Sequence, residues 1–187
     1  MISPHSLART ALATALYAAL STSAIAAPAD PPCENRAQCR SLHAAQVVLG
    51  IINYARWPAL PKPLTLCIVG ATEYADKLWQ NQPLTSRYDI RTKRLLIDNP
   101  QLATECNAVY LGAAAPAKRQ KLFQILSDIP VLTISEHNQG CSQGSMFCLK
   151  VIDSNVGFQI NLDAIARSGI RIHPNVLQLG KRAGTQP

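Results

Sequence analysis

Three basic side chains have the types and spacing needed to hold an anion. Arg171 and His173 are separated by one residue, and Arg56 follows a long apolar stretch much earlier in the chain. If the segment at 171–173 is extended, both of its basic side chains lie on one face, because side chains alternate along a strand. A guanidinium beside an imidazole can bind a carboxylate or a phosphate. The plainer interpretation is a capping histidine and two solvated arginines.

Six cysteines predict disulfide chemistry rather than a metal site. They are Cys33, Cys39, Cys67, Cys106, Cys141 and Cys148. An even number in an exported protein implies disulfides, and six cysteines allow fifteen full pairings. The sequence contains no C-x-x-C motif, and His43 and His137 lack the spacing of zinc-finger ligands. We therefore expect no metal and no cofactor.

A serine-hydrolase motif is present in its spacing but not in its context. Residues 140–144 read G-C-S-Q-G, and Asp163 and His173 follow in the order that hydrolases use. A nucleophile elbow needs a strand before the serine and a helix after it, whereas a strand is expected after Ser142. We interpret the segment as a glycine-rich disulfide loop, and we expect no enzyme activity.

Alternating helices and strands are expected to position these residues. Hydrophobic periodicity predicts helices over 40–57, 72–79, 116–126, 161–167 and 174–179, and strands over 64–69, 88–97, 108–111 and 131–135. This order is typical of an α/β domain with a mostly parallel sheet flanked by helices. The turn residues at 153–155 lie between apolar runs at 147–152 and 156–160, which predicts a C-terminal antiparallel hairpin.

The N-terminus has the features of a secretory signal. Arg9 precedes an apolar stretch at 11–20, and Ala24-Ile25-Ala26 fits the cleavage rule, so the mature chain would begin at Ala27. The expected organisation is a signal peptide over 1–26, a segment rich in proline and cysteine over 27–39, one compact α/β domain over 40–182, and a polar tail over 183–187.

Composition fits one small exported domain. The chain has 187 residues, of which 48% are hydrophobic and 16% charged, so wholesale disorder is excluded. No apolar run of 18 residues follows residue 27, so no membrane span is expected in the mature chain. The net charge is +7. Because the basic residues at 91–94 and 118–121 are interpreted as solvated surface, no nucleic-acid partner is expected.

Several longer segments resemble the YfiR family. The most specific are G-S-M-F-C at 144–148, F-Q-I-N-L at 158–162 and S-G-I-R-I-H-P at 168–174, and the segments 44–58 and 64–78 agree in order and spacing. The resemblance covers nearly all of the mature chain. It implies a compact, often dimeric α/β domain in the periplasm, stabilised by disulfides.

The same resemblance implies a regulatory function. Members restrain an inner-membrane diguanylate cyclase by binding its periplasmic domain, and redox or envelope signals release the cyclase. An outer-membrane lipoprotein can sequester the repressor, and released cyclase raises cyclic di-GMP and favours biofilm. The alternative function is a periplasmic binding protein for a small anionic metabolite.

The resemblance also assigns roles to single residues. It implies disulfides between Cys67 and Cys106 and between Cys141 and Cys148, whereas the pairing of Cys33 and Cys39 stays open. The positions that match partner contacts are Phe147, Gln159 and Ile165. Phe147 is expected as an exposed aromatic anchor, with core packing as the alternative. Arg56, Arg171 and His173 match positions proposed to bind small metabolites in the family.

Overall fold

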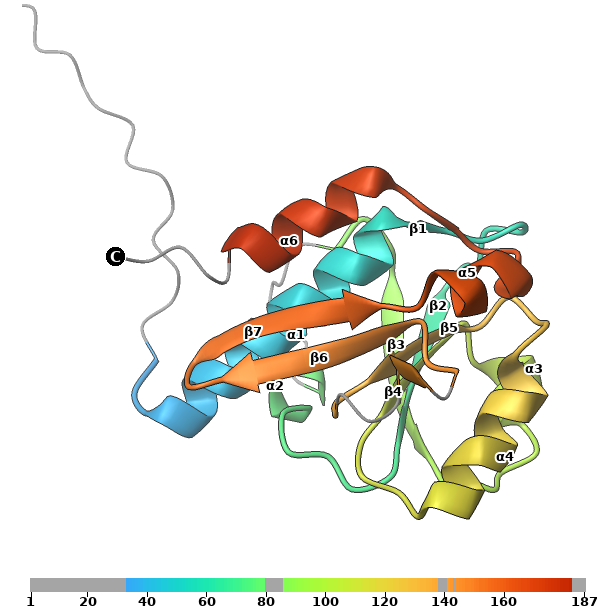
Figure 1. Ribbon diagram of the computed structural model, residues 1–187, viewed down its shortest axis with the longest axis horizontal. Helices are drawn as coiled ribbons and strands as arrows, with labels where there is room; N and C mark the ends of the chain where they lie inside the picture. Colours follow the sequence, from blue (N-terminus) through green and yellow to red (C-terminus); the bar gives the residue numbers. More distant parts are fainter. Residues whose placement is uncertain (1–32, 80–85, 138–140, 143, 183–187) are drawn as a thin grey trace, which may run out of the picture. The chain divides into compact units, whose positions relative to one another are not determined.

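The computed structural model describes residues 33–79, 86–137, 141–142 and 144–182 (Figure 1). The expected signal peptide over 1–26 and the polar tail over 183–187 lie outside the described residues, as do residues 27–32 of the segment expected over 27–39. The described residues belong to one unit that begins at Cys33.

A six-stranded sheet forms the centre of this unit, with the strand order β3-β2-β4-β5-β6-β7. The first five strands along that order are parallel to one another, and β7 runs antiparallel to β6. The strands are β2 (Leu64–Val69), β3 (Ile90–Leu95), β4 (Ala108–Leu111), β5 (Leu132–Ser135), β6 (Phe147–Ile152) and β7 (Asn155–Ile160). The expected mostly parallel α/β fold with a C-terminal hairpin is therefore confirmed.

Two hydrophobic cores lie on opposite faces of the sheet. One core packs the sheet against α1 (Arg36–Tyr54), with further contacts from α5 (Leu162–Ser168) and α6 (Leu177–Arg182). The other core packs it against α3 (Leu102–Glu105) and α4 (Pro116–Leu126). Neighbouring residues of one strand belong to different cores, because side chains alternate between the two faces. A central strand covered on both faces reads as a continuous apolar run, as β2 does.

Several elements differ from the expected bounds. The first helix begins at Arg36, where Asn35 caps it by accepting a hydrogen bond from the Gln38 backbone N–H at 2.9 Å. The expectation of a helix over 72–79 is wrong for its first half, since α2 spans only Asp76–Trp79. The backbone N–H groups of Glu73 and Tyr74 donate instead to the Glu136 carboxylate.

The last part of the chain folds back onto the end of the first helix. A two-residue strand, β1 (Ala55–Arg56), pairs antiparallel with β8 (Arg171–Ile172). The final helix expected over 174–179 is split into the 3₁₀ turn η2 (Pro174–Val176) and α6. The helix expected over 161–167 is confirmed as α5, which ends at Gly169 with a φ of 74°. None of the helices in the described ranges has the length and apolar character that a bilayer crossing requires.

Candidate functional site

The short β1–β8 pairing brings the three expected anion-binding residues together. Arg56 and Arg171 are directly opposite partners in the register, and the neighbouring pair is Ala55 with Ile172. Ala55 is buried, so the two arginines of the next pair face outward together. His173 has an extended backbone and lies two residues beyond Arg171, on the same side. We call Arg56, Arg171 and His173 the basic ribbon.

Aromatic and backbone contacts hold the basic ribbon in place. The His173 ring stacks on Tyr54 with 6.0 Å between ring centroids, and its backbone N–H donates to the Tyr54 carbonyl at 3.0 Å. Arg56 Nη1 donates to the Asn53 and Ala55 carbonyls at 2.8 and 2.7 Å, which places a cation at the carboxyl end of α1. The Tyr88 hydroxyl donates to the same Ala55 carbonyl at 2.9 Å.

The electrostatics of the basic ribbon favour an anion. Like charges directly opposite each other across two strands are unfavourable. Among the described residues, no ion pair joins Arg56 or Arg171 to a carboxylate. Both guanidinium groups and the His173 ring are exposed, and His173 Nδ1 accepts a hydrogen bond from the Asn175 backbone N–H at 3.2 Å. The expected capping role of this histidine is therefore present beside the cluster of positive charge.

The spacing of residues in the sequence indicates these basic residues but not their aromatic neighbours. Tyr54 lies two residues before Arg56, a spacing that puts both on one face if the chain leaves the helix as a strand. Nothing in the sequence marks Tyr88, which comes from the segment before β3.

The structure pairs all six cysteines. Cys67 bonds with Cys106 and Cys141 with Cys148, as the resemblance implied, and Cys33 bonds with Cys39, the pairing that had stayed open. The Cys67–Cys106 disulfide lies in the core between the sheet and α3, where the two residues are 0% and 3% exposed. Cys141 is only partly buried. In the described part of the chain, no group of histidine, cysteine and acidic side chains could hold a metal ion.

The Cys141–Cys148 disulfide lies against one of the expected partner-binding positions. Cys148 and Gln159 are opposite partners in the β6–β7 register, and Cys141 Sγ is 3.6 Å from the Gln159 carbonyl oxygen. Asn161 Nδ2 donates to the Cys141 carbonyl at 2.5 Å, and Asn161 Oδ1 caps α5 by accepting from the Ala164 N–H at 3.0 Å. This disulfide therefore fixes both the end of β7 and the start of α5.

The three expected partner-binding positions do not share one exposed surface. The expectation that Phe147 is an exposed anchor is wrong: the side chain is fully buried and packs edge-on against Phe158 at 5.6 Å. Ile165 is partly buried against the α1 core, whereas Gln159 is exposed. Leu162, at the start of α5, is 73% exposed, which makes it the more accessible apolar residue of this region.

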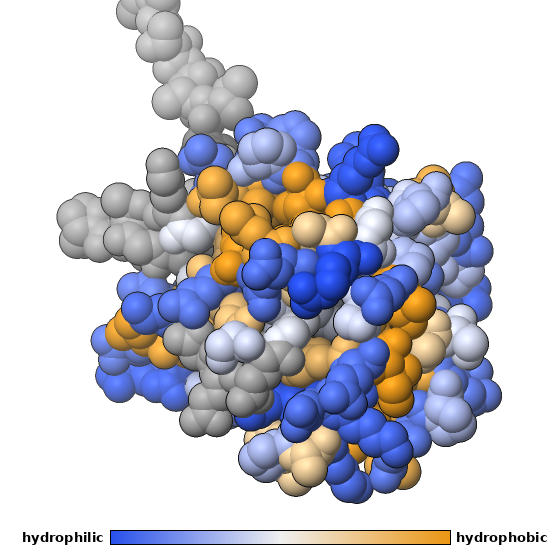
Figure 2. All heavy atoms as spheres, turned by 45° about the vertical axis from the view of Figure 1, so that its right-hand side comes forward, coloured by the Kyte–Doolittle hydropathy of each residue, from blue (hydrophilic) through white to orange (hydrophobic). Residues whose placement is uncertain are grey.

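Apolar residues on the surface are divided among several patches. Figure 2 shows hydrophobic areas on the viewed face that are separated by strongly hydrophilic ones. Among the residues that the structure describes, the large exposed apolar side chains come from six separate segments and are Leu60, Leu96, Ile125, Ile152, Leu162 and Leu177. A partner would therefore recognise a mixed surface with a few apolar contacts.

The residues of the hydrolase spacing are separated in the structure. Ser142 and Asp163 both line a cavity beside α4, but His173 belongs to the basic ribbon, stacked on Tyr54. The strand β6 follows the serine, as expected for a disulfide loop rather than a nucleophile elbow.

One buried carboxylate carries no signal in the sequence. Glu136 follows β5, its side chain is fully buried, and it accepts hydrogen bonds from the Glu73 and Tyr74 N–H groups at 2.8 and 2.6 Å. The Tyr110 hydroxyl donates to it at 2.9 Å. Burial and the neighbouring Glu136 charge raise the pKa of Tyr110 well above its usual value. This network fixes the loop after β2 to the carboxyl ends of β4 and β5.

A comparison with known protein families gives one match over most of the chain. The family is described as YfiR/HmsC-like, and the matched residues are 42–181. This range contains the six-stranded sheet, both buried cores, the basic ribbon and the Cys141–Cys148 disulfide.

Proposed function

Because the chain belongs to the YfiR/HmsC-like family, we propose that it binds the periplasmic domain of an inner-membrane diguanylate cyclase and represses cyclic di-GMP synthesis. Family membership supports a periplasmic regulator of a diguanylate cyclase, in a family that is regulatory and not catalytic. Direct binding, repression, and export after signal cleavage at Ala26 are parts of the proposal.

The observation that supports a redox-sensitive repressor is the position of the Cys141–Cys148 disulfide. It contacts Gln159 on β7 and, through Asn161, the first turn of α5. Opening this bond would free the Cys141 segment from β6 and loosen the support of Gln159 and Leu162. Reduction would then weaken partner binding without dismantling the two cores, and the cyclase would be released.

The partner surface that we propose centres on Gln159 and Leu162, because both are exposed. Gln159 contacts this disulfide, and Leu162 directly follows Asn161, which donates to the Cys141 carbonyl. Replacing Leu162 with arginine puts a charge where an apolar contact would be buried, so we expect loss of binding to the purified periplasmic domain of the cyclase. Leu96→Arg is the matched control, since Leu96 is 75% exposed and lies directly after β3, far along the sheet from β7.

Cyclic di-GMP in cells gives the functional test. Deleting the gene should raise cyclic di-GMP, and wild type and Leu96→Arg should restore the low level, whereas Leu162→Arg should not. An unchanged level after deletion, under several growth conditions, would contradict repression. Equal binding of the cyclase domain by Leu162→Arg and wild type would contradict the proposed partner surface at Leu162, but it would not contradict repression.

The basic ribbon supports a second candidate function, a binding protein for a small anionic metabolite. The supporting observation is the outward pairing of Arg56 and Arg171, two like charges held opposite each other. Titration with citrate and with inorganic phosphate would test it. The double variant Arg171→Ala/His173→Ala should lose anion binding and keep cyclase affinity. Unchanged anion binding in that variant would contradict this function.

A further inference from the structure

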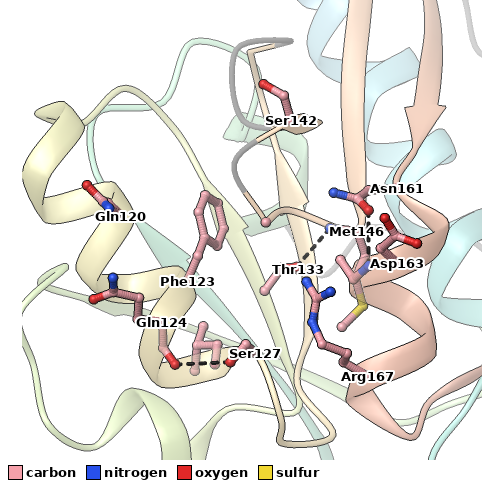
Figure 3. A pocket seen from close by; sticks show the side chains of 13 residues that line it. Gln120, Phe123, Gln124, Ser127, Thr133, Ser142, Met146, Asn161, Asp163 and Arg167 are labelled. Carbon is pink, nitrogen blue, oxygen red and sulfur yellow. Dashed lines mark hydrogen bonds between the residues drawn. The ribbon is translucent and has the colours of Figure 1, made fainter.

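A cavity between α4 and α5 lies apart from the basic ribbon. Its volume is about 480 Å³, and it is bordered by α4, β5, the segment before β6 and α5 (Figure 3). Cavities that bind small organic molecules are of this size. Asn161 and Ser142 on its border belong to the surroundings of the Cys141–Cys148 disulfide, but the charged and apolar side chains that line it have no role in that disulfide or in the basic ribbon.

Two opposite charges lie on the α5 wall of the cavity. Asp163 and Arg167 are four residues apart, so they share one face of the helix with their side chains within reach of a single small ligand. Neither side chain forms an ion pair or a hydrogen bond with another residue in the described ranges. Figure 3 shows the Arg167 side chain extending from α5 toward the α4 side of the cavity.

The rest of the lining combines an apolar surface with neutral polar groups. Phe123 and Met146 are 5% and 2% exposed and offer an aromatic ring and a thioether to the cavity. Gln120 and Gln124, both exposed, border it from α4. The Thr133 hydroxyl is already engaged, since its Oγ1 accepts a hydrogen bond from the Met146 N–H at 3.0 Å.

We propose that this cavity binds a small zwitterion, an α-amino acid with an apolar side chain. Arg167 would hold the carboxylate, Asp163 the ammonium group, and Phe123 and Met146 the side chain. The carboxylate of Asp163 disfavours a simple anion, and the guanidinium of Arg167 disfavours a simple cation. A ligand that carries both charges satisfies both residues and also fills the apolar part.

Calorimetric titration of the full mature chain with L-leucine and L-methionine tests the proposal. We expect at least one of them to bind. N-acetyl-L-leucine lacks the ammonium group and L-leucinamide lacks the carboxylate, so each should bind roughly tenfold more weakly or worse. Arg167→Gln and Asp163→Asn should each cause a similar loss. Arg91→Gln, an exposed arginine on β3, is the matched control and should bind as wild type does.

Three results would overturn the proposal. The first is no binding of either amino acid at about 10 mM, where a millimolar complex would be nearly saturated. The second is equal binding of leucine and its N-acetyl derivative. The third is binding that survives Arg167→Gln but is lost in Arg171→Gln, which would place the ligand at the basic ribbon. Thermal unfolding of each variant establishes that it is folded, and none of these results depends on repression.

Discussion

At the scale of single residues, the Glu136 carboxylate is a buried charge that hydrogen bonds from three other residues stabilise. It is fully buried and receives two backbone N–H groups and the Tyr110 hydroxyl. Glu136→Gln keeps the shape but turns one acceptor oxygen into an N–H₂ donor, which then faces a backbone N–H. We expect urea unfolding to show a loss of roughly 1–3 kcal/mol.

The control for this variant is Glu73→Gln, since Glu73 is an exposed carboxylate in the loop after β2, whose backbone N–H groups donate to Glu136. Its side chain lies 3.9 Å from Arg40, and an exposed ion pair of this kind contributes little. The free energy of unfolding should therefore change by less than about 0.5 kcal/mol. A loss in Glu73→Gln as large as that in Glu136→Gln would contradict the role given to the buried carboxylate.

Tyr110 makes stability depend on pH in the alkaline range. An unfolded tyrosine loses its proton near its usual pKa of 10.0, whereas burial keeps the native Tyr110 protonated to higher pH. Above pH 10 the unfolded state therefore binds fewer protons than the native state. The contribution of Tyr110 to the free energy of unfolding is fully present below that pH and falls as pH rises. For this residue the fall is about 1.4 kcal/mol per pH unit.

The measurement is the free energy of unfolding of wild type and Tyr110→Phe between pH 9 and about pH 11.5. Tyr110→Phe should start lower, because it loses the hydrogen bond to Glu136, and should then decline less steeply. If the free energy of unfolding of the two proteins fell equally steeply with pH, the raised pKa of Tyr110 would be contradicted. Tyr74, whose pKa is raised to about 12 chiefly by burial and the Glu73 side chain, contributes in the same direction in both proteins.

Part of the candidate site could be predicted from the sequence, because alternation along a strand is a local rule. The one-residue spacing of Arg171 and His173 placed both on one face, and the structure agrees. The same rule cannot tell which face of β6 is covered, so the exposure expected for Phe147 was wrong. Glu136 was not predictable, since its donors come from segments more than 25 residues away in sequence.

At the scale of elements, the sequence predicts a strand or helix well where a local pattern, such as a continuous apolar run, is enough to specify it. The bounds of β2 and β4 agree with the apolar runs, because a strand buried on both faces is apolar throughout. The first half of the helix expected over 72–79 is instead a loop, whose N–H groups bind a carboxylate from another strand. The conformation of that segment depends on tertiary contacts, which cannot be predicted from the local sequence.

The elements that cover each disulfide should also determine the order in which the disulfides are reduced. Cys67 and Cys106 lie under α3 in the core and are 0% and 3% exposed, whereas Cys141 is partly exposed in the segment before β6. Thiol–disulfide exchange requires access to a sulfur. In graded dithiothreitol, Cys141–Cys148 should therefore open before Cys67–Cys106.

Alkylation followed by mass spectrometry of the peptides measures this order. Cys33–Cys39, which joins the first turn of α1 to the residues before it, is an internal comparison, because both of its cysteines are also partly exposed. It should open together with Cys141–Cys148. Simultaneous opening of all three disulfides would mean that the protein unfolds globally before any one of them is reached.

At the scale of the whole molecule, the Cys67–Cys106 and Cys141–Cys148 disulfides should affect the proposed repression in different ways. The Cys67–Cys106 loop spans 39 residues, which corresponds to about 4 kcal/mol of stabilisation in the chain-entropy treatment. This is a large part of the roughly 5–15 kcal/mol that holds a domain folded. The Cys141–Cys148 loop spans 7 residues and corresponds to about 2.5 kcal/mol.

Replacing both cysteines of a pair with alanine should therefore separate abundance from affinity. The Cys67→Ala/Cys106→Ala protein should be degraded in cells, because the unfolded fraction rises and proteases remove it. The Cys141→Ala/Cys148→Ala protein should accumulate closer to the wild-type level yet bind the cyclase domain weakly, since the support of Gln159 and α5 is lost. Both variants should raise cyclic di-GMP, so immunoblots and binding by the purified proteins are needed beside it. Wild-type affinity in the purified Cys141→Ala/Cys148→Ala protein would show that this disulfide acts on stability alone.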